Sequence, residues 1–251
     1  MENLIDLSGK VILVTGASSG IGRATAILIS ELGGRVIAVG RNESALKETL
    51  GGLTGQGHQH SVFDLADADQ IPDWMRGIAA DGRLDGLVHM AGIHGARPLR
   101  VSDVDFVNKL LTVNVGSALQ LARGFRHKKV RAATSSIVFA SSIAAMVGEA
   151  GISAYSATKG AIISISRSLA SELAAEGIRV NCVSPSIVKT EMTEKFLETL
   201  TEDQLAAIEK EHPLGFGEPK DVASLISFLI SDSSRWMTGS NIVIDGGYST
   251  K

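Results

Sequence analysis

Short β-branched runs alternate with longer helix-like segments from one end of this 251-residue sequence to the other. We expect strands at residues 11–14, 35–39, 59–63, 86–89, 136–140, 179–183 and 241–244. Segments whose apolar residues follow the helical period lie between them, for example residues 21–32, 104–122, 154–175 and 221–230. The repetition of strand, helix and strand predicts a parallel sheet with helices on both faces.

The first strand is apolar at every position, Val-Ile-Leu-Val over residues 11–14, as expected where helices cover both faces of a sheet. A chain of this length buries about three quarters of its unfolded surface. No linker, low-complexity tract or internal repeat divides the sequence. We therefore predict the α/β fold class, as a single doubly wound Rossmann domain over residues 1–251.

Charge and composition argue against several classes of partner. The net charge is −3, from 24 basic and 27 acidic residues, and no extended basic stripe suggests nucleic acid. The sequence contains no run of 18 apolar residues, so it does not suggest a membrane span, and its first residues do not resemble a secretory signal. The single cysteine, Cys182, excludes an internal disulfide and fits a reducing cytoplasm, so we expect a cytoplasmic protein.

A glycine-rich turn joins the first strand to the first helix, as Thr-Gly-Ala-Ser-Ser-Gly-Ile-Gly-Arg over residues 15–23. Glycines here permit a tight turn, let the backbone approach a pyrophosphate and let the helix pack closely on the strand. The helix N-terminus then favours the anion. The expected dinucleotide-binding residues in this turn are Gly16, Ser18, Ser19, Gly20, Ile21 and Gly22. A merely tight strand-to-helix turn is the alternative.

The end of the second strand indicates which dinucleotide binds. NAD-selective sites usually carry an acidic residue about 20 positions after the glycine motif, to hold the ribose 2′-hydroxyl. Here Gly40, Arg41 and Asn42 stand in that region, and Glu43 falls too far into the next helix to replace the acid. Arg41 can pair with a 2′-phosphate, so we predict NADP(H), with NAD(H) as second choice. An exposed arginine at a strand end is the alternative.

Tyr155 and Lys159 stand four positions apart in a predicted helix, so the phenol and the ammonium share one helix face. Two unit charges about 4 Å apart in a protein interact by roughly 4 kcal/mol, at most about three pK units. Because a nearby cation favours the phenolate, the spacing predicts a lowered tyrosine pKa that suits acid–base work near neutral pH. Such a pair is common on helices, so it does not establish catalysis alone.

Ser141 and Ser142 end the fifth predicted strand. Ligands of parallel sheets bind beyond the carboxyl ends of strands, so Ser142 is placed to hydrogen-bond a substrate carbonyl; a helix cap is the alternative. Asn114 interrupts an apolar helical stretch. A buried amide must be satisfied, so Asn114 either holds a water against Lys159 or bonds neighbouring backbone.

Together these residues resemble the short-chain dehydrogenase/reductase family over nearly the whole chain. The matching pieces are residues 15–22; Phe63-Asp64-Leu65; Ala91-Gly92; Asn114; Ser142; Tyr155 with Lys159; Pro185 with Thr190; and Ile244-Asp245-Gly246-Gly247. The 13 positions between Ser142 and Tyr155 are usual in that family. The resemblance implies a seven-stranded parallel sheet in the order 3-2-1-4-5-6-7.

The resemblance also implies a hydride transfer between a nicotinamide and a ketone or secondary alcohol. Tyr155 would pass the proton, Lys159 would bind the nicotinamide ribose and lower the tyrosine pKa, Ser142 would position substrate, and Asn114 would anchor a water in the relay. Further cofactor-binding residues would be Asp64 and Leu65 beside the adenine, Ala91 and Gly92 at its ribose, and Pro185, Ile187 and Thr190 at the nicotinamide.

Three departures from the family pattern stand near the predicted site. Met90 replaces an asparagine that steadies the central strands, Ser186 replaces a glycine after Pro185, and the stretch 213–217 is one residue short. None removes a reacting group.

The pattern is closest to the 3-oxoacyl-carrier-protein reductase branch, where a basic residue helps dock the acidic carrier. Glu176 occupies that place here, so we expect a free small ketone or alcohol as substrate, with the carrier-linked substrate as the alternative. A binding protein without chemistry is a further alternative, although both Tyr155 and Lys159 are present.

Residues 190–214 are expected to form a substrate lid, or else a plain surface helical hairpin. By resemblance the C-terminal tail packs across a twofold interface, which implies a homotetramer, with a dimer second. No metal site is expected, because His58 and His60 have no evident third ligand.

Overall fold

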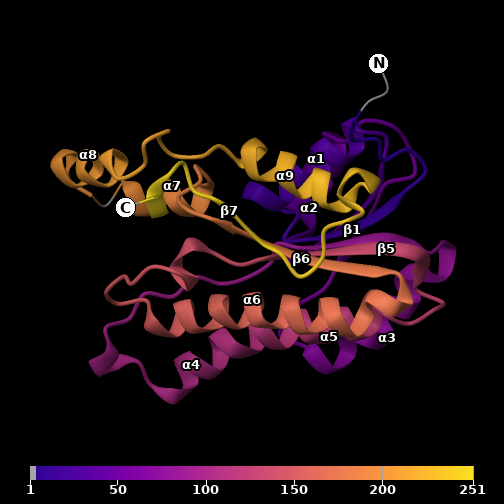
Figure 1. The fold of residues 1–251 in the computed structure, drawn as a ribbon, viewed down its shortest axis with the longest axis horizontal. Helices are drawn as coiled ribbons and strands as arrows, with labels where there is room; N and C mark the ends of the chain where they lie inside the picture. Colours follow the sequence, from indigo (N-terminus) through magenta and orange to yellow (C-terminus); the bar gives the residue numbers. More distant parts are fainter. Residues whose placement is uncertain (1–3, 199, 251) are drawn as a thin grey trace.

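The computed structural model describes residues 4–198 and 200–250, and its centre is a sheet of seven parallel strands. The strand order is 3-2-1-4-5-6-7, which confirms the predicted α/β fold (Figure 1). The strands are β1 (Val11–Thr15), β2 (Arg35–Gly40), β3 (Gln59–Val62), β4 (Leu84–His89), β5 (Arg131–Ala140), β6 (Ile178–Pro185) and β7 (Asn241–Ile244).

Helices cover both faces of the sheet (Figure 1). One layer holds α3 (Ile71–Ile78), α4 (Val104–Leu111), α5 (Ser117–Phe125) and α6 (Ser153–Leu173), and the other holds α1 (Gly20–Glu31), α2 (Glu43–Gly51) and α9 (Pro219–Ile230). Two more helices, α7 (Glu191–Leu197) and α8 (Glu202–Lys210), extend past one end of the sheet, beside the C-terminus. None of the helices in the described residues is long and apolar enough to cross a membrane.

Successive side chains of the central strands enter two separate apolar cores. Leu13 of β1 packs with the layer of α3, α5 and α6, whereas Ile12 and Val14 pack with α1 and α9. All three side chains are fully buried. Because strand side chains alternate between faces, a strand buried on both faces must be apolar throughout, which is the pattern visible in the sequence.

The predicted helix over residues 104–122 is interrupted in the structure. The segment contains α4, a π-helical turn at Thr112–Gly116 and then α5. Asn114 lies in this turn and is buried. A π-turn inserts one extra residue into the helix and is frequent at functional sites. The apolar pattern of residues 104–122 is that of an ordinary helix, so the sequence does not reveal this turn.

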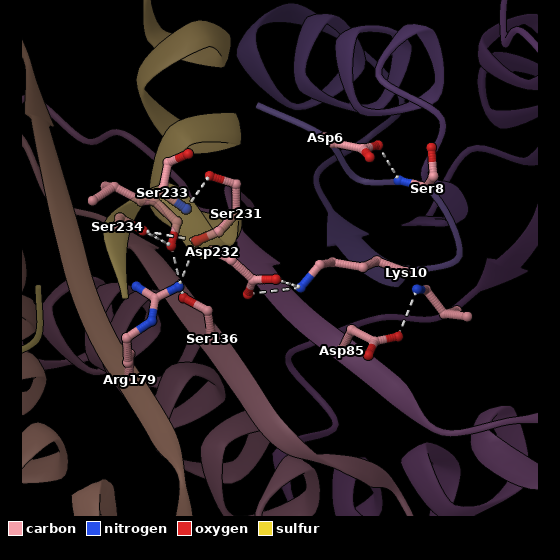
Figure 2. A network of polar contacts seen from close by, with 12 residues as sticks. Asp6, Ser8, Lys10, Asp85, Ser136, Arg179, Ser231, Asp232, Ser233 and Ser234 are labelled. Carbon is pink, nitrogen blue, oxygen red and sulfur yellow. Dashed lines mark hydrogen bonds and ion pairs between the residues drawn. The ribbon is translucent and has the colours of Figure 1, made fainter. Parts of the chain in front are cut away.

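A polar network joins the starting ends of the strands to the end of α9 (Figure 2). Lys10 contacts both carboxylate oxygens of Asp232 at 2.9 Å, and Asp85 accepts the Val11 amide at 2.8 Å. Arg179 donates to the Ser231 carbonyl at 3.1 Å. The network lies where the strands begin. It therefore stabilises the sheet without occupying the opposite side, where the carboxyl ends of the strands lie.

His89 joins β1, β4 and α5 at the centre of the molecule. Its Nδ1 lies 2.8 Å from Thr15 Oγ1, and its Nε2 lies 3.1 Å from Ser117 Oγ. Ser117 donates its own proton to the Val113 carbonyl, so His89 Nε2 carries the hydrogen and Nδ1 accepts. The ring thus joins β1 and β4 to α5, one residue before Met90.

Burial lowers the pKa of His89 from 6.5 to about 3. Below about pH 6.5 the unfolded chain takes up a proton that the folded ring refuses, so folding stability falls as the pH falls toward 3. Between about pH 7.5 and pH 5 we expect His89 to remove about 2 kcal/mol of stability. Urea unfolding of the native protein and of His89→Gln at both pH values measures this, because glutamine does not titrate. Equal pH dependence in the two proteins would contradict it.

Candidate active site

One cavity of about 420 Å³ gathers most of the predicted site residues. Those that line it are Gly16, Ser18, Ser19, Gly20, Ile21, Gly22, Arg41, Asp64, Leu65, Ala91, Gly92, Ser142, Tyr155, Lys159, Pro185 and Thr190. Three predicted residues, Asn42, Asn114 and Ile187, are not part of its wall as described. The cavity follows the carboxyl ends of the strands, where parallel sheets bind their ligands.

The glycine-rich turn forms a cradle that only glycine permits. Gly16 and Gly20 have φ values of 70° and 50°, in the left-handed region. A Cβ added to Gly16 would lie 2.8 Å from the Ala91 nitrogen, and one added to Gly22 would collide with the Gly16 carbonyl. The turn leads into the N-terminus of α1, so this cradle fits the pyrophosphate of a dinucleotide.

Arg23 also holds this turn, although the sequence reading gave it no role. Its guanidinium donates to the Ser18 carbonyl at 2.5 Å and to Thr49 Oγ1 at 3.2 Å. The side chain therefore braces the outer side of the cradle against α2.

The end of β2 presents Arg41 at the mouth of the cavity. Gly40 ends the strand, and the Arg41 side chain is 71% exposed with Nη1 4.0 Å from Asp64 Oδ2. Asn42 instead caps α2, accepting the Ala45 amide at 3.2 Å. Glu43 pairs with Lys47 at 2.8 Å within α2. Arg41 thus presents a cation to the expected position of the adenosine ribose, and β2 provides no carboxylate there.

Buried hydrogen bonds hold the end of β5 against α6. Ser141 donates to the Lys159 carbonyl at 2.8 Å, and Lys159 Nζ donates to the Ala140 carbonyl at 2.9 Å. Ser142 Oγ accepts the Ala144 amide at 3.2 Å, so it caps a short turn and still has its own proton to donate. Cap and substrate contact are therefore compatible roles for Ser142.

The electrostatics of Tyr155 differ from the sequence expectation. Burial raises the pKa of its phenol, and a hydrogen bond with Ser142 opposes the rise. Burial also lowers the pKa of Lys159 to about 8, and its Nζ lies 5.7 Å from the centroid of the Tyr155 ring. Spacing along the helix places the cation correctly, but it does not reveal how strongly the enclosed site disfavours charge.

Asn114 bonds neighbouring backbone, one of its two sequence alternatives. Its Oδ1 accepts the Ile93 amide at 2.8 Å, while its Nδ2 donates to the Ile93 carbonyl at 3.0 Å and to Thr158 Oγ1 at 3.1 Å. The amide therefore joins the loop after β4 to the helix that carries Tyr155. An anchored water remains a prediction.

Several residues of the cavity wall were not predicted from the sequence, and His94 and Ser186 are two of them with polar side chains. His94 packs edge-on against Tyr155, and Ser186 Oγ lies 2.8 Å from His212 Nε2. His212 is buried and contacts the Ile208 carbonyl through Nδ1 at 2.9 Å. The signal for Ser186 was its replacement of a glycine, which could have suggested a new polar contact.

The metal alternative gains no support from the two histidines that suggested it. His58 Nδ1 accepts the Val36 amide at 3.1 Å, and His60 Nε2 lies 3.8 Å from Glu43. Across residues 4–198 and 200–250, no group of three or more metal-ligating side chains is found.

Comparison with known proteins gives the family. A family model described as enoyl-(acyl carrier protein) reductase matches residues 16–249, and 3-oxoacyl-(acyl-carrier-protein) reductase of Rickettsia prowazekii is 37% identical over 246 residues. The chain belongs to the short-chain dehydrogenase/reductase family. That alignment covers 97% of this chain and 98% of the relative.

Solved structures of other short-chain dehydrogenases/reductases match the whole fold. A candidate short-chain alcohol dehydrogenase of Sinorhizobium meliloti gives a TM-score of 0.93 at 32% identity, covering 99% of this chain and 100% of that one. A candidate NAD(P)-dependent gluconate 5-dehydrogenase of Beutenbergia cavernae, with NADP bound at low occupancy, gives 0.91 at 32% identity with the same coverage. This short-chain dehydrogenase/reductase is therefore an oxidoreductase that acts on CH–OH groups with a nicotinamide dinucleotide.

Proposed function

We propose that this protein interconverts a small, free ketone and its secondary alcohol with NADP(H), using Tyr155 as the general acid and base. The observation that carries this proposal is the convergence of Ser142, Tyr155 and Lys159 in the cavity that the glycine-rich turn also lines. The bound dinucleotide supplies or accepts the hydride. The protein supplies placement and the proton.

Each of the three side chains has a distinct task. The Ser142 and Tyr155 hydroxyls hydrogen-bond the substrate carbonyl, which places its oxygen where charge develops. Tyr155 then gives up its proton, and its raised pKa means that the phenol holds this proton at neutral pH. The Lys159 ammonium, mostly charged at neutral pH with its pKa near 8, stabilises the phenolate left behind.

Preference for NADP(H) rests on Gly40 and Arg41. An exposed guanidinium at the cavity mouth suits a 2′-phosphate, which it can hold through charge-assisted hydrogen bonds. The Beutenbergia cavernae neighbour with bound NADP supports the same choice. We propose that Asp64, Leu65, Ala91 and Gly92 hold the adenosine half, and Pro185, Ile187 and Thr190 the nicotinamide half.

Reduction of an acyl chain on its carrier protein is the second candidate, because the Rickettsia prowazekii relative bears that name. The surface at Glu176 argues against it. Glu176 lies 2.6 Å from Arg126 and 3.5 Å from Arg131, and Arg126 also pairs with Glu172 at 3.1 Å. These carboxylates neutralise the two arginines, so the surface beside Glu176 attracts an acidic carrier less than a basic residue at that position would.

We further propose that α7 and α8 act as the substrate lid and that the protein assembles as a homotetramer, with a dimer second. Thr190 and Thr193 line the cavity at the start of α7, which supports a lid. Trp236, 96% exposed just before β7, supports burial of the C-terminal tail against another copy.

Replacing Tyr155 with phenylalanine tests the reaction. We expect Tyr155→Phe to reduce kcat for ketone reduction by roughly 100- to 10,000-fold, the range of general acid catalysis, while NADPH still binds. Tyr248→Phe is the matched control, because Tyr248 is the only other tyrosine and does not line the cavity as described. Full activity in Tyr155→Phe, or no oxidation of NADPH with any ketone, would refute the proposal and favour a binding protein without chemistry.

The same assay separates the two substrates. We expect kcat/KM for a 3-oxoacyl chain attached to the carrier protein to be no higher than kcat/KM for the same chain attached to pantetheine alone. A clear advantage of the carrier-linked chain in kcat/KM would favour the second candidate.

Removing the Arg41 guanidinium tests the dinucleotide preference. We expect Arg41→Ala to lower kcat/KM for NADPH about tenfold and to leave that for NADH nearly unchanged, because only NADPH has the 2′-phosphate. Arg100→Ala, an exposed arginine outside the cavity wall, is the control. An equal loss with both dinucleotides, or a preference of the native protein for NADH, would contradict the assignment.

A further inference from the structure

His94 lies beside the reacting phenol, in the loop that follows β4. Its ring meets the Tyr155 ring edge-on, with centroids 4.7 Å apart and planes at 62°. It lines the active-site cavity and also a second cavity of about 480 Å³ that Phe106 and Leu110 of α4 help to form. His94 is exposed rather than packed in the core, so its ring faces the space that a substrate would enter.

The position of His94 is fixed by the backbone next to it. Both the amide and the carbonyl of Ile93 are hydrogen-bonded to Asn114, which also bonds Thr158 in the first turns of α6. Thr158 in turn donates to the Tyr155 carbonyl at 2.7 Å. One side chain therefore sets the loop of His94 and the helix of Tyr155 relative to each other.

The ring of His94 has hydrogen-bonding capacity to spare. Within the part of the chain that the structure describes, neither ring nitrogen has a hydrogen-bond partner. The ring is only partly enclosed by the cavity wall, and this partial burial lowers the pKa of His94 from its ordinary value, an effect that Glu149 opposes and Lys159 adds to, so the neutral ring predominates at pH 7. A neutral imidazole offers one donor and one acceptor, which matches a hydroxyl better than an anion.

We propose that His94 hydrogen-bonds a hydroxyl on the carbon next to the reacting carbon, which makes the substrate an α-hydroxy ketone or, in the reverse direction, a vicinal diol. The inference rests on the proposed function, because the reacting carbonyl must lie on Tyr155 for its neighbour to reach His94. The second cavity shares Ile93 and His94 with the active-site cavity and leaves room for the rest of such a molecule.

A pair of ketones that differ by one hydroxyl tests the proposal. We expect the native enzyme with NADPH to prefer 2-hydroxycyclohexanone to cyclohexanone in kcat/KM, and His94→Phe to lower that ratio about tenfold, the effect of one hydrogen bond. His94→Gln, which keeps a donor and an acceptor, should retain part of the ratio. His127→Phe is the control, since this exposed histidine lies outside both cavity walls as described.

The outcomes are distinct from those of the proposed function. A ratio near one in the native enzyme, or the same ratio in His94→Phe, would overturn the role of His94 even if Tyr155→Phe abolishes ketone reduction. If no ketone is reduced at all, the proposed function fails first and the role of His94 falls with it. Titration of each variant with NADPH by tryptophan fluorescence verifies that it has folded.

Discussion

The contact between the end of β5 and the helix α6 is the interaction on which the site depends. Ser141 bonds the Lys159 carbonyl, and Lys159 Nζ bonds the Ala140 carbonyl, so a strand end and a helix turn are joined by two buried hydrogen bonds. Lys159 is 7% exposed, and losing either bond would leave a buried polar group unsatisfied. This closure brings the hydroxyl of Ser142 and the phenol of Tyr155 to the same cavity.

Burial has opposite effects on the two titrating groups of this site. It raises the pKa of Tyr155 and lowers that of Lys159, because the enclosed site disfavours the phenolate and the ammonium alike. A phenol that keeps its proton is a suitable acid for reducing a ketone, and an ammonium nearby becomes valuable only once the proton has left. The arrangement therefore stabilises a charge that forms during the reaction rather than one that exists beforehand.

The sequence predicts the sheet well because each strand is marked by a short apolar run, and such runs recur along the chain between helical segments. Apolar strands such as residues 11–14 can be buried only by helices on both faces, and the order of strands followed from the family resemblance. The glycine-rich turn and the pair of Tyr155 and Lys159 were visible because their spacing fixes their geometry. Sixteen of the predicted residues line a single cavity, although their roles remain proposals.

Features that depend on distant partners could not be predicted. The π-turn at Asn114 has the apolar pattern of a plain helix, and its bonds reach Ile93 and Thr158, which are far away in the sequence. His89 joins β4 to β1 and α5 only because Thr15 and Ser117 lie on either side of its ring. The raised pKa of Tyr155 depends on enclosure by several elements, which spacing along one helix does not report.

The pH dependence of ketone reduction tests the central claim, that the Lys159 ammonium stabilises the phenolate of a phenol that otherwise keeps its proton. Because burial lowers the pKa of Lys159 to about 8 and raises that of Tyr155, the ammonium loses its charge as the pH rises while the phenol still holds its proton. We predict that kcat for ketone reduction with NADPH falls as the pH rises through about 8 in the native protein, and that Lys159→Met has a low kcat without this fall. A native kcat that stays constant through this range, or the same fall in Lys159→Met, would contradict the account.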